Sequence, residues 1–364
     1  MNTILLSTAH APYFTVSAEN AQNSTTQKEK SDIMKLLKKL LSLFTASALI
    51  LSLCACSSES GYFEGDSTKL KIISTVFPPY DLAKHIAGEN AELKILLPAG
   101  SEIHNYEPTA RDIIEIQNCD IFLYIGGENE QWADKIVSSN DTSKVKIVKL
   151  IDYVPTLSED DEDEHEHEDE DEDAHEHEDE HNHHNHDHET DEHIWTSPKN
   201  ARLMLSAVYD AICAVDPENS KLYTENKDAY DKQLAELDND YKTAIDSAKN
   251  KTIVLADKFP FRYLAHEYGL DCYAAFSACS DESEPSVSTM IKLTDKIKEN
   301  RIPAVYYLEF SSTKIANTLC DETGATKLML HSCHNVSKED LENDISYVDL
   351  MKQNLENLKV ALNG

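Results

Sequence analysis

Histidine and carboxylate side chains alternate along one stretch of this 364-residue chain, residues 159–193. The stretch holds 21 acidic residues and 10 histidines in 35 positions. Because it has almost no apolar surface to offset its ordering entropy, we expect residues 159–192 to form a disordered acidic insertion. Imidazoles and carboxylates both bind zinc-like cations, so the insertion predicts several weak metal sites. The histidines assigned to these sites are His175, His177, His181, His183, His184, His186 and His188.

The first part of the insertion, residues 159–164, contains acidic residues alone and fits a solvated linker equally well. The second part differs, because His183 and His184 are adjacent and other histidines lie close by. Metal capture is the favoured interpretation of the second part.

Two more histidines, His104 and His193, have a more specific context. His104 lies in residues 98–108, a loop between a predicted strand and a predicted helix, and His193 follows the last strand of the same lobe. Ligand groups of α/β folds lie at the carboxyl ends of strands. A single loop histidine usually has no ligand role, but two in equivalent places predict a defined metal site outside the insertion.

Short apolar runs alternate with amphipathic stretches on both sides of the insertion, which is typical of βα units and parallel sheets. A long helix begins at Asp216-Pro217 and would extend for about 50 Å. The sequence therefore predicts an α/β fold: two parallel-sheet lobes, residues 69–197 and 251–364, joined by linking helices in residues 198–250. Predicted strands are residues 71–76, 92–97, 121–125, 145–150, 252–256 and 304–308; predicted helices are residues 79–86, 108–118, 132–137, 198–215, 216–249, 262–268, 287–300, 313–322 and 347–362.

The N-terminal part of the sequence has the pattern of a targeting segment. Lysines precede the apolar run of residues 40–53, and Leu53-Cys54-Ala55-Cys56 follows. Residues 34–55 are predicted to be a signal peptide, since the run is short for a transmembrane helix. The last four residues resemble a bacterial lipobox, which would make Cys56 the lipidated first residue of the mature protein, followed by a tether over residues 56–68. Residues 1–33 show no signal-like pattern and are set aside as an upstream extension.

Several local motifs together carry a resemblance that covers about residues 70–358. The chain resembles the metal-binding solute-binding lipoproteins of ABC importers for zinc and manganese, and its His-rich insertion resembles the zinc branch of that family. The motifs are residues 100–108, Asp191-Glu192-His193-Ile194-Trp195, the start of the long helix at Asp216-Pro217, Tyr263-Leu264-Ala265 with Tyr268-Gly269-Leu270, and Glu284-Pro285-Ser286.

The resemblance implies one buried ion in the cleft between the lobes, with two ligands from each lobe. His104 and His193 match the first two ligand positions, and Glu107 matches an acidic residue that could orient an imidazole. The third position holds Lys258, a poor ligand while protonated. Asp257 is expected to replace it, with Lys258 directed away toward the permease or an acidic partner.

The fourth position falls near His331, so the expected ligands are His104, His193, Asp257 and His331. Asp257 as a helix cap and His331 as a surface histidine are the structural alternatives, and Cys333 or His334 could be the ligand in place of His331. Three imidazoles and one carboxylate favour zinc over manganese, whereas copper and nickel are not distinguished by this ligand chemistry.

The resemblance implies a non-enzymatic, extracytoplasmic zinc receptor, anchored to the membrane by lipid, that passes its ion to the permease of an ABC importer. We expect a monomer. A net charge of −34 argues against nucleic acid as a partner, although 21 of the acidic residues lie in residues 159–193. The alternatives are a zinc store or adhesin that works through the insertion, and a zinc hydrolase. A hydrolase needs an open coordination position and a general base, and no predicted helix carries a His-Glu-x-x-His motif.

Six cysteines remain besides Cys54 and Cys56. Cys119 and Cys213 fall in apolar helical patterns and are expected to be buried. Four others allow a disulfide in the C-terminal lobe, with three possible connectivities: Cys272, Cys279, Cys320 and Cys333.

Overall fold

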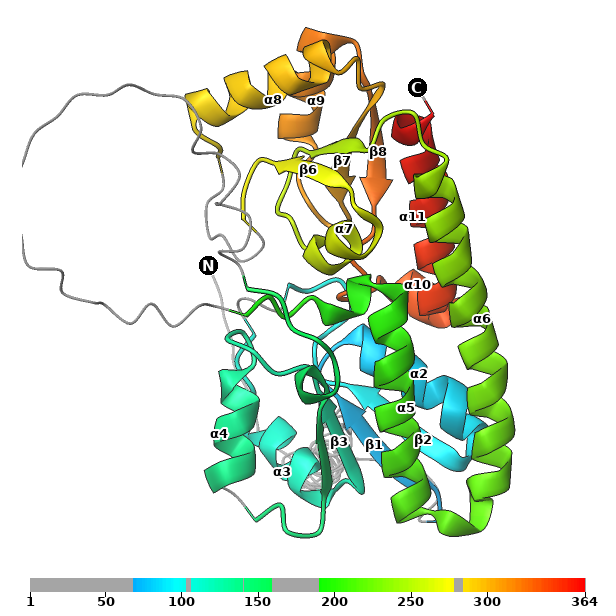
Figure 1. The fold of residues 1–364 in the computed structure, drawn as a ribbon. Coiled ribbons are helices and arrows are strands. Elements are labelled where there is room, and N and C mark those ends of the chain that lie inside the picture. Colours follow the sequence, from blue (N-terminus) through cyan, green and yellow to red (C-terminus); the bar gives the residue numbers. More distant parts are fainter. Residues whose placement is uncertain (1–67, 103–105, 140, 159–189, 278–283, 364) are drawn as a thin grey trace, which may run out of the picture. The chain divides into compact units, whose positions relative to one another are not determined.

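The computed structural model describes residues 68–102, 106–139, 141–158, 190–277 and 284–363. Tyr62–Gly364 form one compact unit that contains two parallel sheets of four strands each (Figure 1). The predicted fold class, α/β with two parallel-sheet lobes and a long connecting helix, is confirmed. Cys56 and the insertion histidines lie outside the described residues.

The sheet of the N-terminal lobe has the strand order β2-β1-β3-β4. Its central strands are buried at nearly every position, because the connecting helices cover the faces of a parallel sheet. The strands are β1 (Leu70–Ser74), β2 (Ala91–Ile95), β3 (Ile121–Tyr124) and β4 (Lys146–Lys149), and the connecting helices are α2 (Phe77–Ala87), α3 (Ala110–Asn118) and α4 (Gln131–Ser139).

The sheet of the C-terminal lobe has the order β6-β5-β7-β8. Its two edge strands, β6 and β8, were not among the predicted strands. Both expose part of their length to solvent, and neither shows the full burial of the central strands. The strands are β5 (Thr252–Leu255), β6 (Asp271–Ala274), β7 (Ala304–Leu308) and β8 (Thr326–Leu330), and the helices are α7 (Arg262–Tyr268), α8 (Val287–Glu299) and α9 (Lys314–Thr323).

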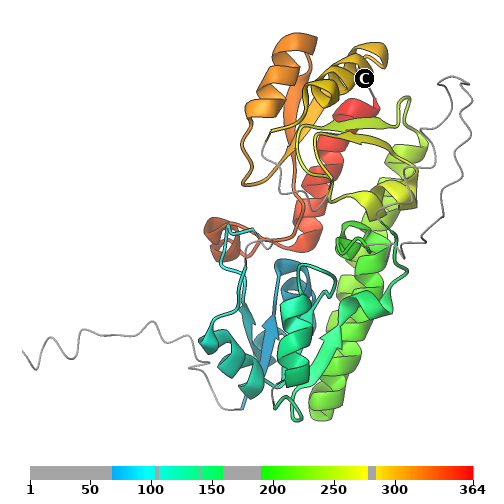
Figure 2. The ribbon, with the colours of Figure 1, turned by 90° about the vertical axis from the view of Figure 1, so that its left-hand side faces the viewer.

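Three long helices pack side by side with one another and the lobes: α5 (Pro198–Val215) on the N-terminal lobe, α11 (Tyr347–Leu362) on the C-terminal sheet, and α6 (Ser220–Asp246), which contacts both lobes. α6 contacts α2 and α5 of the first lobe, and α7 and α11 of the second (Figures 1 and 2). It is shorter than predicted, because a 3-10 turn at Pro217–Asn219 precedes it and it ends at Asp246. Its buried face is the apolar stripe expected from the sequence: Tyr223, Tyr230, Leu234, Leu237, Tyr241 and Ile245.

A short helix, α10 (Lys338–Glu342), was not predicted and begins at a capping box formed by Ser337 and Asp340. The segment before it, between β8 and α10, reaches the first lobe: Phe77 N donates to His334 O at 3.1 Å and Gly100 N donates to Val336 O at 2.9 Å. Within the described ranges, no helix is both long and apolar enough to cross a membrane.

A buried carboxylate on α2 ties this helix to α6. Asp81 is 1% exposed, and its Oδ2 accepts a hydrogen bond from the hydroxyl of Tyr230 on α6. His85 lies one turn further along α2, with Nδ1 2.9 Å from the carbonyl oxygen and 3.4 Å from Oδ1 of Asp81. Its ring stacks on Tyr230 at a centroid distance of 3.8 Å.

This arrangement makes part of the stability depend on pH. Burial alone would lower the pKa of His85, but the hydrogen bonds and charge of Asp81 outweigh it and raise the pKa above the ordinary 6.5. The stabilisation is complete below about pH 6.5 and is lost as the pH rises through the folded-state pKa. We expect His85→Gln to reduce the free energy of unfolding more at pH 6 than at pH 8.5, measured by urea titration. Equal losses of unfolding free energy at both pH values would contradict this. The insertion histidines are present in both proteins, so their contribution cancels when the two proteins are compared.

Candidate metal centre

A small polar cavity lies where strands of both sheets end. Its volume is about 80 Å³, which suits an ion with a few water molecules and is far below the roughly 300 Å³ of the smallest usual organic-ligand pockets. Loops that follow β2, β5, β7 and β8 contribute to its wall, in agreement with the rule that ligands bind at strand carboxyl ends. The ionisable residues on the wall are Glu102, His193, Asp257, Lys258, Glu309 and His334.

His193 is the predicted ligand whose position the structure supports best. The residue is 2% exposed and lines the cavity. Asp191 Oδ1 accepts a hydrogen bond from the His193 backbone N–H at 2.7 Å and lies 3.1 Å from Nδ1 of its ring. A neutral imidazole that donates through Nδ1 carries its lone pair on Nε2, so this contact selects the tautomer that a metal ligand needs.

Residues of the C-terminal lobe hold the Asp191 carboxylate and backbone in place. The Arg262 guanidinium lies 3.5 Å from Asp191 Oδ2, and the Tyr263 hydroxyl donates to the backbone carbonyl of Asp191 at 2.6 Å. Burial alone would raise the pKa of Asp191, but the charge and hydrogen bonds of His193, together with Arg262, hold it below its usual value. The carboxylate stays ionised and keeps the imidazole oriented.

Glu309 directly follows β7 and was not singled out from the sequence. Its carboxylate accepts hydrogen bonds from Ser332, from the backbone N–H at 2.7 Å and from the hydroxyl. Burial raises its pKa to about 7. The signal was available, because residues 304–308 were predicted as a strand and the rule that places ligands at strand ends points to the next residue.

Asp257 and Lys258 both lie on the cavity wall, beyond the end of β5. Asp257 Oδ2 accepts from the Leu308 backbone N–H at 3.1 Å, which ties the ends of β5 and β7 together. Lys258 Nζ lies 4.0 Å from Glu102 Oε2, in the loop that follows β2. The acidic partner expected for Lys258 is therefore within this chain, and the lysine lines the cavity rather than pointing away from it.

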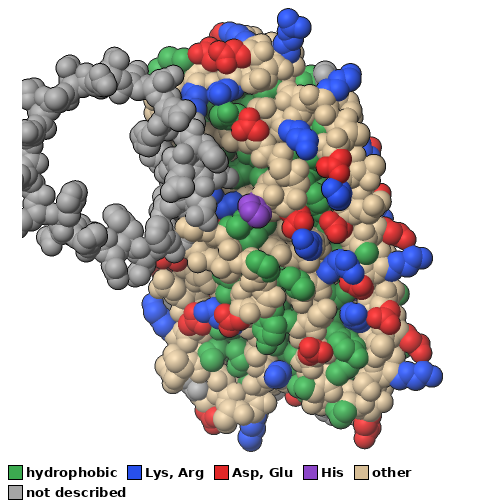
Figure 3. Space-filling model, viewed as in Figure 1, with side chains coloured by type: hydrophobic (Ala, Val, Ile, Leu, Met, Phe, Trp, Pro, Cys, Tyr) green, Lys and Arg blue, Asp and Glu red, His purple; other side chains and the backbone are tan. Residues whose placement is uncertain are grey.

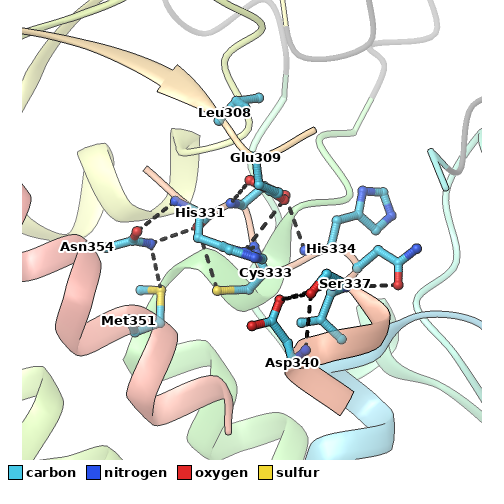
Figure 4. A network of polar contacts seen from close by, with 12 residues as sticks. Leu308, Glu309, His331, Cys333, His334, Ser337, Asp340, Met351 and Asn354 are labelled. Carbon is cyan, nitrogen blue, oxygen red and sulfur yellow. Dashed lines mark hydrogen bonds and ion pairs between the residues drawn. The ribbon is translucent and has the colours of Figure 1, made fainter. Parts of the chain in front are cut away.

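His331 lies behind the cavity wall. It is 4% exposed, it is not among the residues that line the cavity, and its Nδ1 accepts a hydrogen bond from the Cys333 backbone N–H at 3.0 Å. Burial lowers its pKa to about 4, so the ring is neutral at physiological pH. His334, three residues later, lines the cavity instead, and the two rings lie on different sides of their segment (Figure 4).

His104 lies outside the described residues, so its place in the site stays a prediction. Glu107 is described and exposed, on the wall of an adjoining cavity of about 580 Å³ that shares Ser101 and Glu102 with the first. Among the described residues, no three His, Cys, Asp or Glu side chains are grouped closely enough to hold an ion by themselves. A complete shell needs either a movement of the cavity wall or a further donor such as His104.

The cysteines do not pair in the described part of the chain. Cys119 and Cys333 are buried free thiols, and Cys213 is half-buried rather than fully buried. Cys272 and Cys320 are also free, and Cys279 lies outside the described residues. Burial raises the pKa of Cys333 well above its ordinary value, which disfavours it as a thiolate ligand.

Comparison with known proteins gives consistent matches over most of the chain. The zinc-binding lipoprotein AdcA of Streptococcus pneumoniae is 33% identical over 321 residues, which are 88% of this chain and 60% of that protein. The high-affinity zinc uptake system protein ZnuA of Bacillus subtilis is 33% identical over 332 residues, which are 90% of this chain and 99% of that protein. The crystal structure of the Zn(II)-bound ZnuA-like domain of S. pneumoniae AdcA superposes with a TM-score of 0.66 at 30% identity, and the match covers 81% of this chain and all of that one.

The chain thus spans less than two thirds of the pneumococcal relative and nearly all of the Bacillus one. The family model for the periplasmic zinc-uptake complex component A, ZnuA, matches residues 72–361. Since this match covers well over half of the sequence, the chain belongs to the ZnuA family of zinc-uptake components.

Proposed function

We propose that this chain is the zinc-binding receptor of an ABC-type uptake system and that its ion binds in the cavity between the two sheets. The observation that carries the proposal is His193, a buried imidazole on the cavity wall whose tautomer is set by the ionised Asp191. Family membership supports the same function, because relatives matched over most of this chain are named as zinc-binding and zinc-uptake proteins.

The ligand set that we propose keeps His104, His193 and Asp257 from the sequence and adds Glu309. Asp257 and Glu309 place two carboxylates on the same wall as His193. Imidazole nitrogens together with carboxylate oxygens are a usual donor set for zinc, whereas manganese prefers sites with more oxygen. The zinc ion is here a cargo to be bound and released, and the family is one of transport components rather than enzymes.

The partner of such a receptor is a membrane permease that accepts the ion. We propose that the chain works outside the cytoplasm as a monomer, held at the membrane by a lipid on Cys56. Nucleic acid is not proposed as a partner: on the face in Figure 3, basic side chains are interspersed with acidic ones and form no continuous patch.

The competing function is zinc storage by the insertion. It can be tested separately from transport, because the two residues that flank residues 159–189 are adjacent in the fold and the segment can be removed. Ser158 and Thr190 form an antiparallel bridge, so their backbones are adjacent. Residues 159–189 can therefore be replaced by a two-residue Asn-Gly turn without stretching the chain. We expect this variant to lose several weak zinc equivalents and to retain one tight ion in a competitive titration. A folded variant with no tight site would support storage instead.

The orientation of His193 by Asp191 can be tested with an isosteric change. Asp191→Asn removes the negative charge that pairs with Arg262 and favours the Nδ1–H tautomer. We expect the zinc affinity to fall by roughly 10–100-fold, the usual cost of losing a partner behind a metal ligand. The control is Asp231→Asn, which breaks a surface pair with Arg202 between α5 and α6. Equal affinities of Asp191→Asn and Asp231→Asn would refute the orienting role.

The lipid anchor has its own test. We expect Cys56→Ala to prevent lipidation, so that the protein is released into the medium or accumulates as unprocessed precursor. Cell fractionation and the mass of the N-terminal peptide measure both outcomes. Normal processing and retention at the membrane in the variant would exclude Cys56 as the anchor.

A further inference from the structure

A cavity beside α7, the α7 cavity, shares no lining residue with the metal cavity or with its neighbour. Its volume is about 440 Å³, within the roughly 300–1,000 Å³ of pockets that bind organic ligands. Leu157 and Ser158 line it together with residues of α7 and of the turn that follows α7. A Cβ atom on Gly269, in that turn, would meet no heavy atom within 4 Å, which agrees with open space at this end of the helix.

Two side chains of α7 give the α7 cavity a basic character, those of Arg262 and His266. They are four residues apart, so they lie on the same face of the helix. The Arg262 side chain is only 11% exposed, and its guanidinium lies 3.5 Å from Asp191 Oδ2. A guanidinium carries five N–H donors in a planar fork, so it can bind a second carboxylate while it stays beside the first. The α7 cavity therefore favours a carboxylate as its ligand.

The chain enters the insertion at the α7 cavity. The Leu157 backbone N–H donates to the Tyr263 hydroxyl at 3.1 Å, and its carbonyl accepts from the Asp191 backbone N–H at 3.0 Å. These bonds fix the segment before the insertion against α7. Ser158 lines the cavity itself, so residue 159 begins at the cavity wall.

The residues that follow Ser158 carry the charge that complements this cavity. Residues 159–164 are six consecutive carboxylates, and the first histidine of the insertion is His165. Six residues extend over up to roughly 20 Å, whereas Arg262 and His266 are about 6 Å apart along the axis of α7. Because these carboxylates are covalently attached beside the cavity, they compete for it at an effective concentration on the order of millimolar.

We propose that residues 159–164 are an intramolecular ligand of the α7 cavity, with their carboxylates bound to the Arg262 guanidinium and to His266. The acidic start of the insertion then has a role separate from metal capture. It fixes the insertion to the C-terminal lobe and gives a second carboxylate partner to the arginine that also holds Asp191. This assignment depends neither on the metal ligands nor on the zinc-receptor function.

The first test measures the protection of His266 in the zinc-free full chain. Diethyl pyrocarbonate modifies accessible imidazoles, and peptide mass spectrometry gives the rate at His266, which is exposed in the absence of an occupant. Replacing each Glu of residues 159–164 by Gln and each Asp by Asn removes the charge and keeps the shape. We expect this variant to be modified about threefold faster, the range for ion pairs that are partly exposed. Arg262 is left unchanged, because it also contacts Asp191.

The insertion supplies its own matched control. Residues 168–173 are another run of six carboxylates and, like residues 159–164, consist of three Glu and three Asp. The same replacement there removes the same charge at a distance from the α7 cavity. We expect the control to leave the modification rate of His266 unchanged. Equal rates in the two variants would overturn the proposal, because His266 would then respond only to the net charge or not at all.

A cross-link identifies the occupant directly. His266→Lys places a primary amine in the α7 cavity, and a water-soluble carbodiimide condenses an amine with a touching carboxylate to an amide. We expect the links from this amine to the insertion to fall within residues 159–164. Lys199 and Glu267, whose side chains lie 3.0 Å apart, are the internal positive control in the same digest. Links spread evenly over both acidic runs, links only to a second copy of the chain, or no link to the insertion while the control pair is joined would overturn the proposal.

Discussion

The contact between Asp191 and His193 is the interaction on which the rest of the site depends. Asp191 is fully buried, and a buried carboxylate is costly unless charge and hydrogen bonds compensate it. Its partners come from both sides: His193 from the end of the N-terminal lobe, and Arg262 and Tyr263 from α7 of the C-terminal lobe. The same contacts therefore orient a ligand and join the two lobes, so a change at Asp191 should affect both.

The charges around the cavity explain why a divalent cation suits it. Three carboxyl groups face it, from Glu102, Asp257 and Glu309, against one ammonium, from Lys258. Asp257 and Glu309 are fixed by backbone N–H groups at the ends of neighbouring strands, so they cannot turn away to solvent without breaking those bonds. A cation entering the cavity would gain attraction from this negative wall at short range, where solvent screens it less than at the surface.

Much of the fold follows from local sequence patterns. α5, α7, β7 and α11 have the predicted bounds, because each has a clear apolar periodicity or apolar run. The edge strands β6 and β8 were missed, because β8 is only partly apolar and a short apolar run such as residues 272–276 cannot be told from a buried helical segment by periodicity alone. A site residue that directly follows a predicted strand can be found from the sequence, and Glu309, the residue after β7, could have been found in this way. Which of His331 and His334 lines the cavity could not be predicted, because it depends on the backbone conformation of Cys333 and on Asn354, which lies 23 residues after His331.

The most direct test of the central claim is a crystal structure of the zinc-loaded protein with anomalous data collected at the zinc edge. We expect one strong anomalous peak in the cavity, about 2.0–2.2 Å from nitrogen or oxygen atoms of His193 and of at least one of Asp257 and Glu309. Zinc found on the insertion histidines with none in the cavity would contradict this expectation.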